Sequence, residues 1–575
     1  MSAEQFIQQK AAAAILAIYG TEVAETSLQV SVTRKEFEGD YTLVTFPLLK
    51  ITRQAPDATG NAIGEWLVAN VPEISAFNSV KGFLNLSFSP VYWNESLQAM
   101  VSEETFGQLP STGKRIMVEF SSPNTNKPLH LGHIRNNLLG DSVSRILKAC
   151  GNEVIKATLV NDRGVHICKS MYAWEKCFNG ATPESTGKKG DHLVGDCYVA
   201  YAKMEKEHPE VIDDVHKMLV DWEAGDPHVR ELWAMMNGWV YKGFDETYAA
   251  LGISFDQVDH ESETYLLGKE LVQKGLQEGV FVKDPDGSVW CDLTADGLDR
   301  KLVLRGDGTS VYITQDLGTA ERRFASFKLD SHVYVVGNEQ DYHFQVLKLI
   351  LKKLGFAWAD QIYHLSYGMV ELPEGKMKSR EGTVVDADDL IQQMYEEAKK
   401  TSEESGKLEG MPEAEKEALY HMIGLGALKY FIIKVDPKKT MLFNPKESID
   451  FNGNTGPFIQ YTHARIQSIL RKATVPYGPA DTLGAQPSGK EVRLIKLLGL
   501  YPGKVGEAGA ALSPAIIANY AYDLAKEFNQ YYHDTPILKE ENEAVLKFRL
   551  ALIDTLARTL RHAMALLGIS LPERM

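Results

Sequence analysis

The sequence is poor in the features that mark secreted, membrane-embedded and metal-clustered proteins. Its 575 residues include only five cysteines and no Cys-x-x-Cys pair, so neither a disulfide framework nor a structural zinc site is indicated. No apolar run approaches the ~20 residues of a membrane-spanning helix, and the N-terminal MSAEQFIQQKAAAA lacks a basic segment leading into a hydrophobic core. We therefore expect a cytoplasmic protein with reduced thiols and no membrane partner.

The chain also lacks an excess of positive charge, since its formal net charge is -16. This balance argues only weakly against a nucleic-acid partner, because residues 456–575 carry 14 Lys and Arg against 11 Asp and Glu. The acidity therefore lies elsewhere in the chain. With 44% hydrophobic and 24% charged residues, the sequence is typical of a soluble globular protein, and its length predicts three or four domains.

The most informative stretch runs from Val118 to Gly151. It shows an apolar strand, a polar loop, the tetrapeptide HLGH at 130–133, and a helix with apolar residues at helical spacing that ends at Gly151. A strand, a tight loop and a helix N-terminus form an anion site, because unpaired N–H groups and the helix dipole point at the ligand. We expect both imidazoles to donate to phosphoryl oxygens, beside a glycine that leaves room for a nucleotide.

The whole chain divides into four expected parts. Residues 1–108 predict a small α/β domain, and residues 109–400 predict a doubly wound parallel sheet with a helical insertion at about 172–245. Beyond 400 the alternation stops and three-to-four residue apolar spacing takes over. We expect a helical connector at 401–455 and an all-α bundle at 456–575.

Several polar groups follow predicted strands, at the edge where parallel sheets bind ligands. The segment SVYITQD predicts a strand entering a helix, with Thr314 as N-cap and Asp316 in the first turn. After the strand HVYVVG, Glu339 is suited to a ribose hydroxyl. Each pattern alone is more often a capped helix than a binding site.

The motifs together resemble class I aminoacyl-tRNA synthetases, and arginyl-tRNA synthetases in particular. HLGH is similar to the HIGH signature of the class, and EFSSPN with Lys127 is similar to the arginyl version. GFLNLSF resembles the GFxN strand of the N-terminal domain, FDQVDHES resembles FDxxxxES, and GNTGPFIQY with HARIQSIL resembles the start of the helical anticodon-binding domain. The resemblance spans nearly the whole chain and is weakest at 172–245.

The resemblance implies a set of site residues. The expected catalytic residues are His130, His133, Lys127, Lys376 and Lys378, and the expected nucleotide-binding residues are Leu131, Gly132, Gly337, Glu339, Gly368 and Met369. The expected arginine-binding residues are Glu119, Ser121, Asn124, Glu261, Tyr312, Asp316 and Gln340. Phe83 would stack on a base of the tRNA D-loop, and Asn85 would hydrogen-bond to its edge.

Two of these expectations also have a chemical basis. A guanidinium is a planar fork of five donors, so a selective pocket needs carboxylates backed by an aromatic or hydroxyl group, as Glu261, Asp316 and Tyr312 provide. The loop GKMKSREG resembles the KMSKS loop that closes over triphosphate, but Ser379 stands where the signature has its second lysine. Many arginyl-tRNA synthetases depart in the same way and carry a lysine just upstream of HIGH, here Lys127.

The expected function is an arginine–tRNA ligase. ATP, carrying Mg²⁺, and L-arginine would give arginyl-adenylate, and the arginyl group would move to the terminal ribose of tRNA(Arg). We expect a monomer and no resident protein-bound metal. Two alternatives stay open: a small-molecule adenylate-forming ligase with the same core, which would not need the helical bundle, and a non-catalytic tRNA-binding paralogue, which would have lost the pocket.

Overall fold

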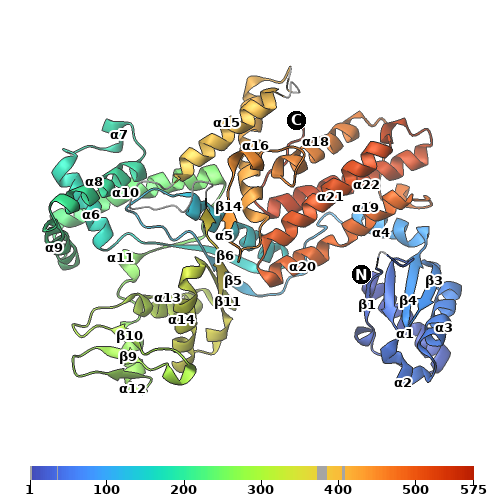
Figure 1. Ribbon diagram of the computed structural model, residues 1–575, viewed down its shortest axis with the longest axis horizontal. Helices are drawn as coiled ribbons and strands as arrows, with labels where there is room; N and C mark the ends of the chain where they lie inside the picture. Colours follow the sequence, from blue (N-terminus) through green and yellow to red (C-terminus); the bar gives the residue numbers. More distant parts are fainter. Residues whose placement is uncertain (1–2, 35, 372–384, 405–407, 409) are drawn as a thin grey trace.

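In the computed structural model, residues 3–34, 36–371, 385–404, 408 and 410–575 are described. The N-terminal part is a four-stranded antiparallel sheet in the order β1-β2-β4-β3, with helices packed against it (Figure 1). Its elements are α1 (Ala3–Tyr19), β1 (Val30–Val32), β2 (Tyr41–Val44), α2 (Leu49–Thr52), α3 (Pro56–Asn70), β3 (Ile74–Val80), β4 (Phe83–Phe88) and α4 (Pro90–Ser102). Leu84 and Leu86 on β4 are fully buried in its core.

A five-stranded parallel sheet in the order β12-β11-β5-β6-β7 forms the centre of the chain. Its strands are β5 (Arg115–Glu119), β6 (Glu153–Val160), β7 (Gln257–His260), β11 (Ser331–Gly337) and β12 (Ile362–Tyr367). The chain moves outward from β5 through β6 and β7, then returns to β11 on the other side of β5. Such a reversal opens a crevice at the carboxyl ends of the strands, between β5 and β11.

Helices cover both faces of this sheet. Val118 of β5 packs in the same core as α5 (Leu131–Ala149), whereas Met117 faces a second core with α13 (Tyr312–Phe327) and α14 (Asp341–Lys353). This alternation follows from the two-residue period of a strand. The predicted fold class, a parallel α/β core with a small N-terminal α/β unit and a C-terminal helical bundle, is confirmed.

Two further groups of elements interrupt the central sheet. Between β6 and β7 lie α6 (Val165–Cys177), α7 (Pro183–Thr186), α8 (Gly190–Glu207), α9 (Val211–Ala224) and α10 (Pro227–Leu251). After β7 come α11 (Glu261–Thr264), α12 (Lys269–Gln277) and a three-stranded antiparallel sheet of β8 (Phe281–Lys283), β9 (Val289–Cys291) and β10 (Lys301–Leu304). We call α6–α10 the helical insertion. It lies at the opposite end of the molecule from the N-terminal unit (Figure 1).

The C-terminal part is helical and packs against α5. Its elements are α15 (Ala387–Glu404), α16 (Glu413–Ile433), α17 (Pro445–Ser448), α18 (Gly456–Lys472), α19 (Gly489–Gly499), α20 (Tyr501–Ala511), α21 (Pro514–Asp534) and α22 (Glu543–Leu566), and β14 (Met441–Leu442) pairs in parallel with β13 (Val370–Glu371). The N-terminal unit docks on these helices: Asn94 donates to the carbonyl of Ala485 at 2.9 Å. Within the described residues, no helix is both long and apolar enough to cross a membrane.

One expected helix start is corrected. Helix α13 begins at Tyr312 with Val311 as N-cap, so Thr314 lies in the first turn and not at the cap. The Thr314 hydroxyl accepts from the Val311 N–H at 3.1 Å and donates to the Val303 carbonyl. The segment before the helix is not a strand either, since only Ser310 forms an isolated bridge, to Leu304.

A buried ion-pair group ties two strands of the central sheet to helix α13, which packs on it. Arg323 of α13 is 1% exposed and pairs with Glu119 of β5 and, at 2.7 Å, with Asp259 of β7. The adjacent Arg322 also pairs with Asp259, at 2.8 Å, but its side chain is 36% exposed.

We predict that Arg323→Met destabilises the protein by about 3–5 kcal/mol, because two buried carboxylates lose their common partner. Arg322→Met is the matched control and should cost about 1 kcal/mol or less, since the Arg322 side chain is 36% exposed and Asp259 keeps its pair with Arg323. Denaturant unfolding of the full chain followed by tryptophan fluorescence measures both. Equal effects of the two substitutions would contradict the structural role of Arg323.

Candidate active site

One end of the candidate site is built by the N-terminus of α5. His130 is its N-cap, and its Nδ1 accepts the Gly132 N–H at 3.1 Å. The His130 N–H in turn donates to Nδ1 of His133, also at 3.1 Å, and the two rings lie 4.0 Å apart. Because both Nδ1 atoms accept main-chain N–H groups, each ring carries its proton on Nε2. The pair therefore offers two Nε2–H donors beside the positive end of a helix.

Both imidazoles are neutral at physiological pH. Burial, with a smaller contribution from the Lys127 charge, lowers the pKa of His130 to about 4. Burial lowers the pKa of His133 well below its ordinary value, and the charges of His130 and Lys127 act in the same direction. A Cβ on Gly132 would lie 3.0 Å from the His130 ring, so this glycine makes room first of all for the imidazole.

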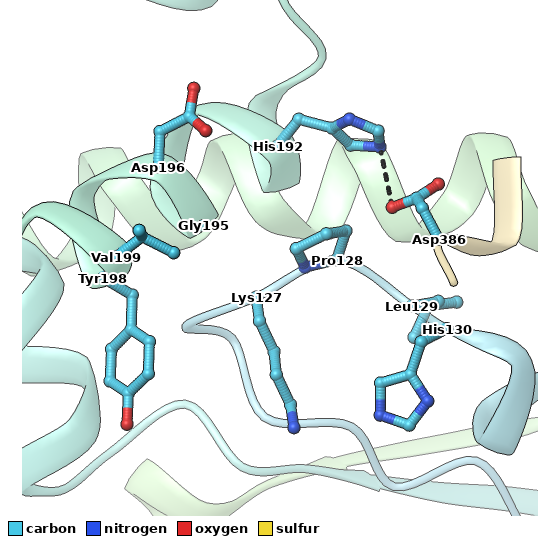
Figure 2. Close-up of a pocket in the computed structure, with 10 residues that line it drawn as sticks. All are labelled: Lys127, Pro128, Leu129, His130, His192, Gly195, Asp196, Tyr198, Val199 and Asp386. Carbon is cyan, nitrogen blue, oxygen red and sulfur yellow. Dashed lines mark ion pairs between the residues drawn. The ribbon is translucent and has the colours of Figure 1, made fainter. Parts of the chain in front are cut away.

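A cavity of about 200 Å³ opens beside His130. Figure 2 shows Lys127 and His130 extending from one loop towards the same side. Tyr198 of α8 extends to that side as well, whereas the Asp196 carboxylate points the other way. Burial lowers the pKa of the Lys127 ammonium, which favours any ligand that brings negative charge. The cavity is lined by Lys127, Pro128, Leu129, His130, His192, Gly195, Asp196, Tyr198, Val199 and Asp386.

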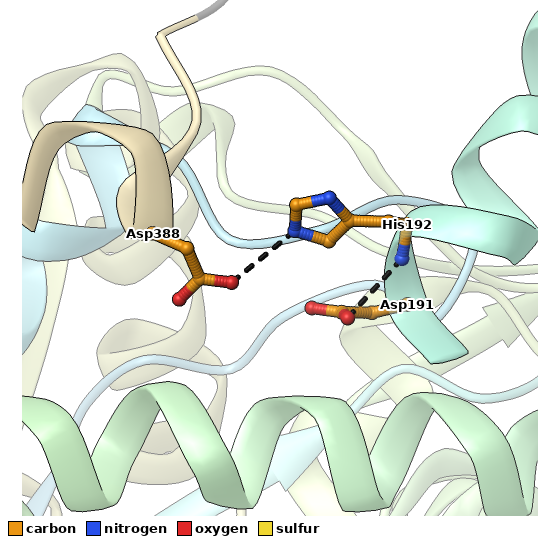
Figure 3. A group of neighbouring side chains, drawn as sticks. All are labelled: Asp191, His192 and Asp388. Carbon is orange, nitrogen blue, oxygen red and sulfur yellow. Dashed lines mark hydrogen bonds and ion pairs between the residues drawn. The ribbon is translucent and has the colours of Figure 1, made fainter. Parts of the chain in front are cut away.

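Next to the cavity, a polar cluster joins the helical insertion to the start of α15. Asp191, His192 and Asp388 bring their ligand-type atoms within 4.8 Å of one another (Figure 3). Nζ of Lys189 lies 2.6 Å from Asp388 and 3.3 Å from Asp191. The lysine ammonium thus already supplies the cation, and the cluster works as a tie between α8 and α15. Hydrogen bonding to Asp388 raises the pKa of His192.

The loop after β5 is strongly bent. Ser121 and Ser122 have φ values of 72° and 45°, which non-glycine residues rarely adopt. Ser121 is buried, its N–H donates to Asn136, and its hydroxyl is 2.7 Å from the Tyr248 hydroxyl. Asn124 is exposed and forms a bridge with Asn161 after β6. Of the expected arginine ligands on this loop, Asn124 is therefore the more accessible one.

The carboxylates expected to bind the guanidinium lie at the same edge of the sheet. Glu261 is the first residue of α11, directly after β7, and the Gln315 side chain hydrogen-bonds to it. Burial raises the pKa of Glu261 to about 7, with the charges of Asp162 and Asp316 adding to the effect. Asp316 lies on α13, 2.6 Å from Nε2 of His343. Tyr312, one turn before Asp316, is 78% exposed.

Of the expected nucleotide-binding residues, Leu131 and Gly132 begin α5, and the other four lie at or just after the ends of β11 and β12. Glu339 and Gln340 are exposed, and a Cβ on Gly337 would meet nothing within 4 Å, so this corner is open. Gly368 is buried instead: its N–H donates to Pro437, and a Cβ there would lie 2.5 Å from the Thr440 nitrogen. Met369 is exposed beside it. Lys376, Lys378 and Ser379 lie outside the described residues.

The two residues expected to contact tRNA lie on β4, in the N-terminal unit. Phe83 is 43% exposed and packs edge-on against Phe46, whereas Asn85 is 3% exposed and accepts a hydrogen bond from the Thr42 hydroxyl at 2.6 Å. The Asn85 amide nitrogen has no hydrogen-bond partner among the described residues. Its donor capacity is therefore unused, although little of the side chain reaches the surface.

Sequence reasoning missed the residues that hold this site in place. Arg323 and Asp259 fix the buried Glu119, and His343 contacts Asp316. Asp162, which follows β6 and is fully buried, is another residue of this kind. The sequence offers one signal for such residues, a charged residue inside an apolar segment or at the end of a predicted strand. This signal does not show which residue the charge pairs with.

Comparison with known proteins agrees with this geometry. The family described as tRNA synthetases class I (R), catalytic domain, matches residues 96–444, and the DALR anticodon binding domain matches residues 459–575. The arginine–tRNA ligase of Bacteroides thetaiotaomicron is 57% identical over 99% of this chain and 100% of its own length. That of Flavobacterium psychrophilum is 54% identical, with both chains fully covered.

A solved structure leads to the same assignment. The arginyl-tRNA synthetase of Thermus thermophilus superimposes with a TM-score of 0.83 at 27% identity, and the match covers both chains completely. The predicted resemblance is thereby confirmed over the catalytic and C-terminal parts alike. The chain belongs to the arginine–tRNA ligase family of class I aminoacyl-tRNA synthetases.

Proposed function

We propose that this protein is an arginine–tRNA ligase that activates L-arginine with ATP and transfers it to tRNA(Arg). One observation carries the proposal. The carboxyl edge of a single parallel sheet presents a pair of neutral imidazole donors after β5 and two carboxylates, Glu261 and Asp316, near β7 and α13. The first pair suits phosphoryl oxygens, and the second suits a guanidinium.

In the proposed reaction the protein supplies no nucleophile and acts by positioning the substrates and stabilising charge. A carboxylate oxygen of arginine attacks the α-phosphorus, an O–P bond forms, and the bond to pyrophosphate breaks. A ribose hydroxyl of tRNA then attacks the arginyl carbonyl, and AMP leaves. The roles proposed for this chain are donation by Nε2–H of His130 and His133, charge neutralisation by Lys127, and binding of the guanidinium by Glu261, Asp316 and Tyr312.

Magnesium is expected to enter with ATP and to neutralise part of the triphosphate charge. The ion prefers oxygen ligands and commonly keeps several waters. Asp196 and Asp386 line the cavity beside Lys127, but Asp196 is ion-paired with Lys188 at 2.5 Å and Asp386 with His192 at 3.4 Å. We therefore assign this ion to the triphosphate and its water shell, and to no protein carboxylate.

The remaining parts of the chain suit tRNA. Under this proposal, Phe83 and Asn85 of the N-terminal unit (residues 1–108) contact the D-loop, and the helices of residues 456–575 contact the anticodon. The match of that region to an anticodon binding domain favours the ligase over a small-molecule adenylate-forming enzyme. We expect a cytoplasmic monomer.

We predict that Asp316→Asn raises the KM for arginine by on the order of 10² or more, because losing one partner of a desolvated cation costs about 3–5 kcal/mol. ATP binding should barely change. Asp307→Asn, at an exposed aspartate of the loop before α13, is the control and should leave both constants unaltered. Steady-state pyrophosphate exchange measures both, and an unaltered arginine KM would remove Asp316 from the pocket.

The raised pKa of Glu261 predicts a pH dependence of arginine use. In the free enzyme this carboxyl is protonated below about pH 7 and cannot pair with a guanidinium. We expect kcat/KM for arginine to rise about tenfold per pH unit up to that pKa and then to level off. His130, with a pKa of about 4, does not titrate in this range. A flat profile in the wild type, or an unchanged limb in Glu261→Gln, would contradict the assignment.

Ser379 stands where the signature has its second lysine, so another residue must bring that charge to the phosphates. If Lys127 reaches the phosphates instead, Lys127→Ala should lower kcat for adenylate formation by on the order of 10² or more, with little change in the KM for arginine. Adding Ser379→Lys should restore part of the rate.

The competing hypothesis is that Lys378 supplies this charge. In that case Lys127→Ala would be nearly neutral, and Lys378→Ala would lose activity. Measuring adenylate formation by both alanine variants decides between the two lysines.

A further inference from the structure

Asp162 is a fully buried carboxylate at the carboxyl end of β6. Its side chain accepts hydrogen bonds from the Tyr241 hydroxyl at 2.6 Å, the Ser262 N–H at 2.8 Å and the Ser262 hydroxyl at 2.9 Å. His260 Nδ1 lies 3.0 Å from the same carboxylate. These donors satisfy the charge, and they keep the pKa of Asp162 below its usual value despite burial.

The helical insertion supplies part of this network from one face of α10. Trp233 Nε1 donates to the Asp162 carbonyl at 2.6 Å, and Asn237 Nδ2 points at the same oxygen at 3.4 Å. Tyr241 then bonds to the carboxylate. The three side chains are four residues apart, so successive turns of one helix hold the backbone and the side chain of Asp162.

The other side of the network holds the residue next to Glu261. Ser262 gives both its N–H and its hydroxyl to Asp162, which fixes the first turn of the four-residue helix α11. So short a helix has little stability of its own. The position of the Glu261 carboxyl therefore depends on this anchor.

We propose that Trp233, Asn237 and Tyr241 of α10 act through Asp162 and Ser262 as a positioning relay for Glu261, so that the helical insertion sets the affinity for arginine. The inference rests on the proposed function, because Glu261 matters here as a guanidinium ligand. None of the relay residues needs to touch substrate. A purely structural role would instead loosen the whole site, and arginine and ATP would be affected alike.

The test is Tyr241→Phe, which removes one hydroxyl and keeps the ring. We expect the KM for arginine to rise about tenfold, as for loss of a hydrogen bond to a charged group. The KM for ATP and kcat at saturating arginine should change by less than about twofold, because the relay acts on the arginine side only. Calorimetric titration of arginine, without ATP or tRNA, should show the same loss of affinity.

Tyr172→Phe is the matched control. Its hydroxyl donates to a carboxylate of the same insertion, Asp214, at 2.9 Å, but it has no bond to Asp162. Arginine affinity should stay at the wild-type value in this variant. The relay is overturned if Tyr241→Phe behaves like Tyr172→Phe, or if it weakens arginine and ATP equally.

The two proposals fail in different ways. If the wild-type protein binds arginine in the calorimeter but forms no arginyl-tRNA, the ligase proposal is contradicted. The relay is then still tested by comparing the arginine affinities of the wild type and Tyr241→Phe. A wild-type protein that binds no arginine contradicts both proposals. A fully active wild type with an unaffected Tyr241→Phe variant contradicts the relay alone.

Discussion

The site depends on one buried guanidinium. Arg323 lies between Glu119 of β5 and Asp259 of β7, and it belongs to α13, the helix that carries Tyr312 and Asp316. Burying a charge is costly unless it is paired and fully hydrogen-bonded, so this arrangement tolerates little displacement of any of the three elements. The planar fork of the guanidinium fixes direction as well as distance. The ion pairs thereby fix β5, which precedes the two imidazoles, relative to α13, which carries Asp316.

The parts that the sequence predicted correctly are those decided by local interactions. The strand, loop and helix from Val118 to Gly151 follow from periodicity and from a C′ glycine, which has a φ of +82° as that position requires. The parallel sheet follows from alternating patterns. The N-cap of α13 was misassigned because Thr314 bonds to Val303 of a neighbouring strand, and the sequence does not show that competing partner. The small sheet β8–β10 was not anticipated, since its strands are only three or four residues long.

The supporting residues could not be predicted, because their roles exist only in three dimensions. Asp162 and Tyr241 are separated by 79 positions, and Glu119 and Arg323 by 204. The spacing of motifs in the sequence locates the residues that are expected to touch substrate. The residues that hold them in position are recognised only in the structure, as buried charged side chains with paired partners. The helical insertion, where the family resemblance is weakest, lines the cavity beside Lys127 and also holds Asp162, the anchor of the Glu261 segment.

If the two histidines bind phosphoryl oxygens as proposed, their tautomer has a consequence for the reaction cycle. Neutral Nε2–H donors recognise the direction of a phosphoryl oxygen but exert no net coulombic pull on it. Once the bond to the α-phosphorus breaks and the oxygens move apart, a hydrogen bond that depends on alignment weakens, whereas attraction between full charges would persist over the same displacement. A charged pair would hold the leaving pyrophosphate after it has served its purpose. An uncharged pair would instead release the pyrophosphate as soon as the alignment of these hydrogen bonds is lost.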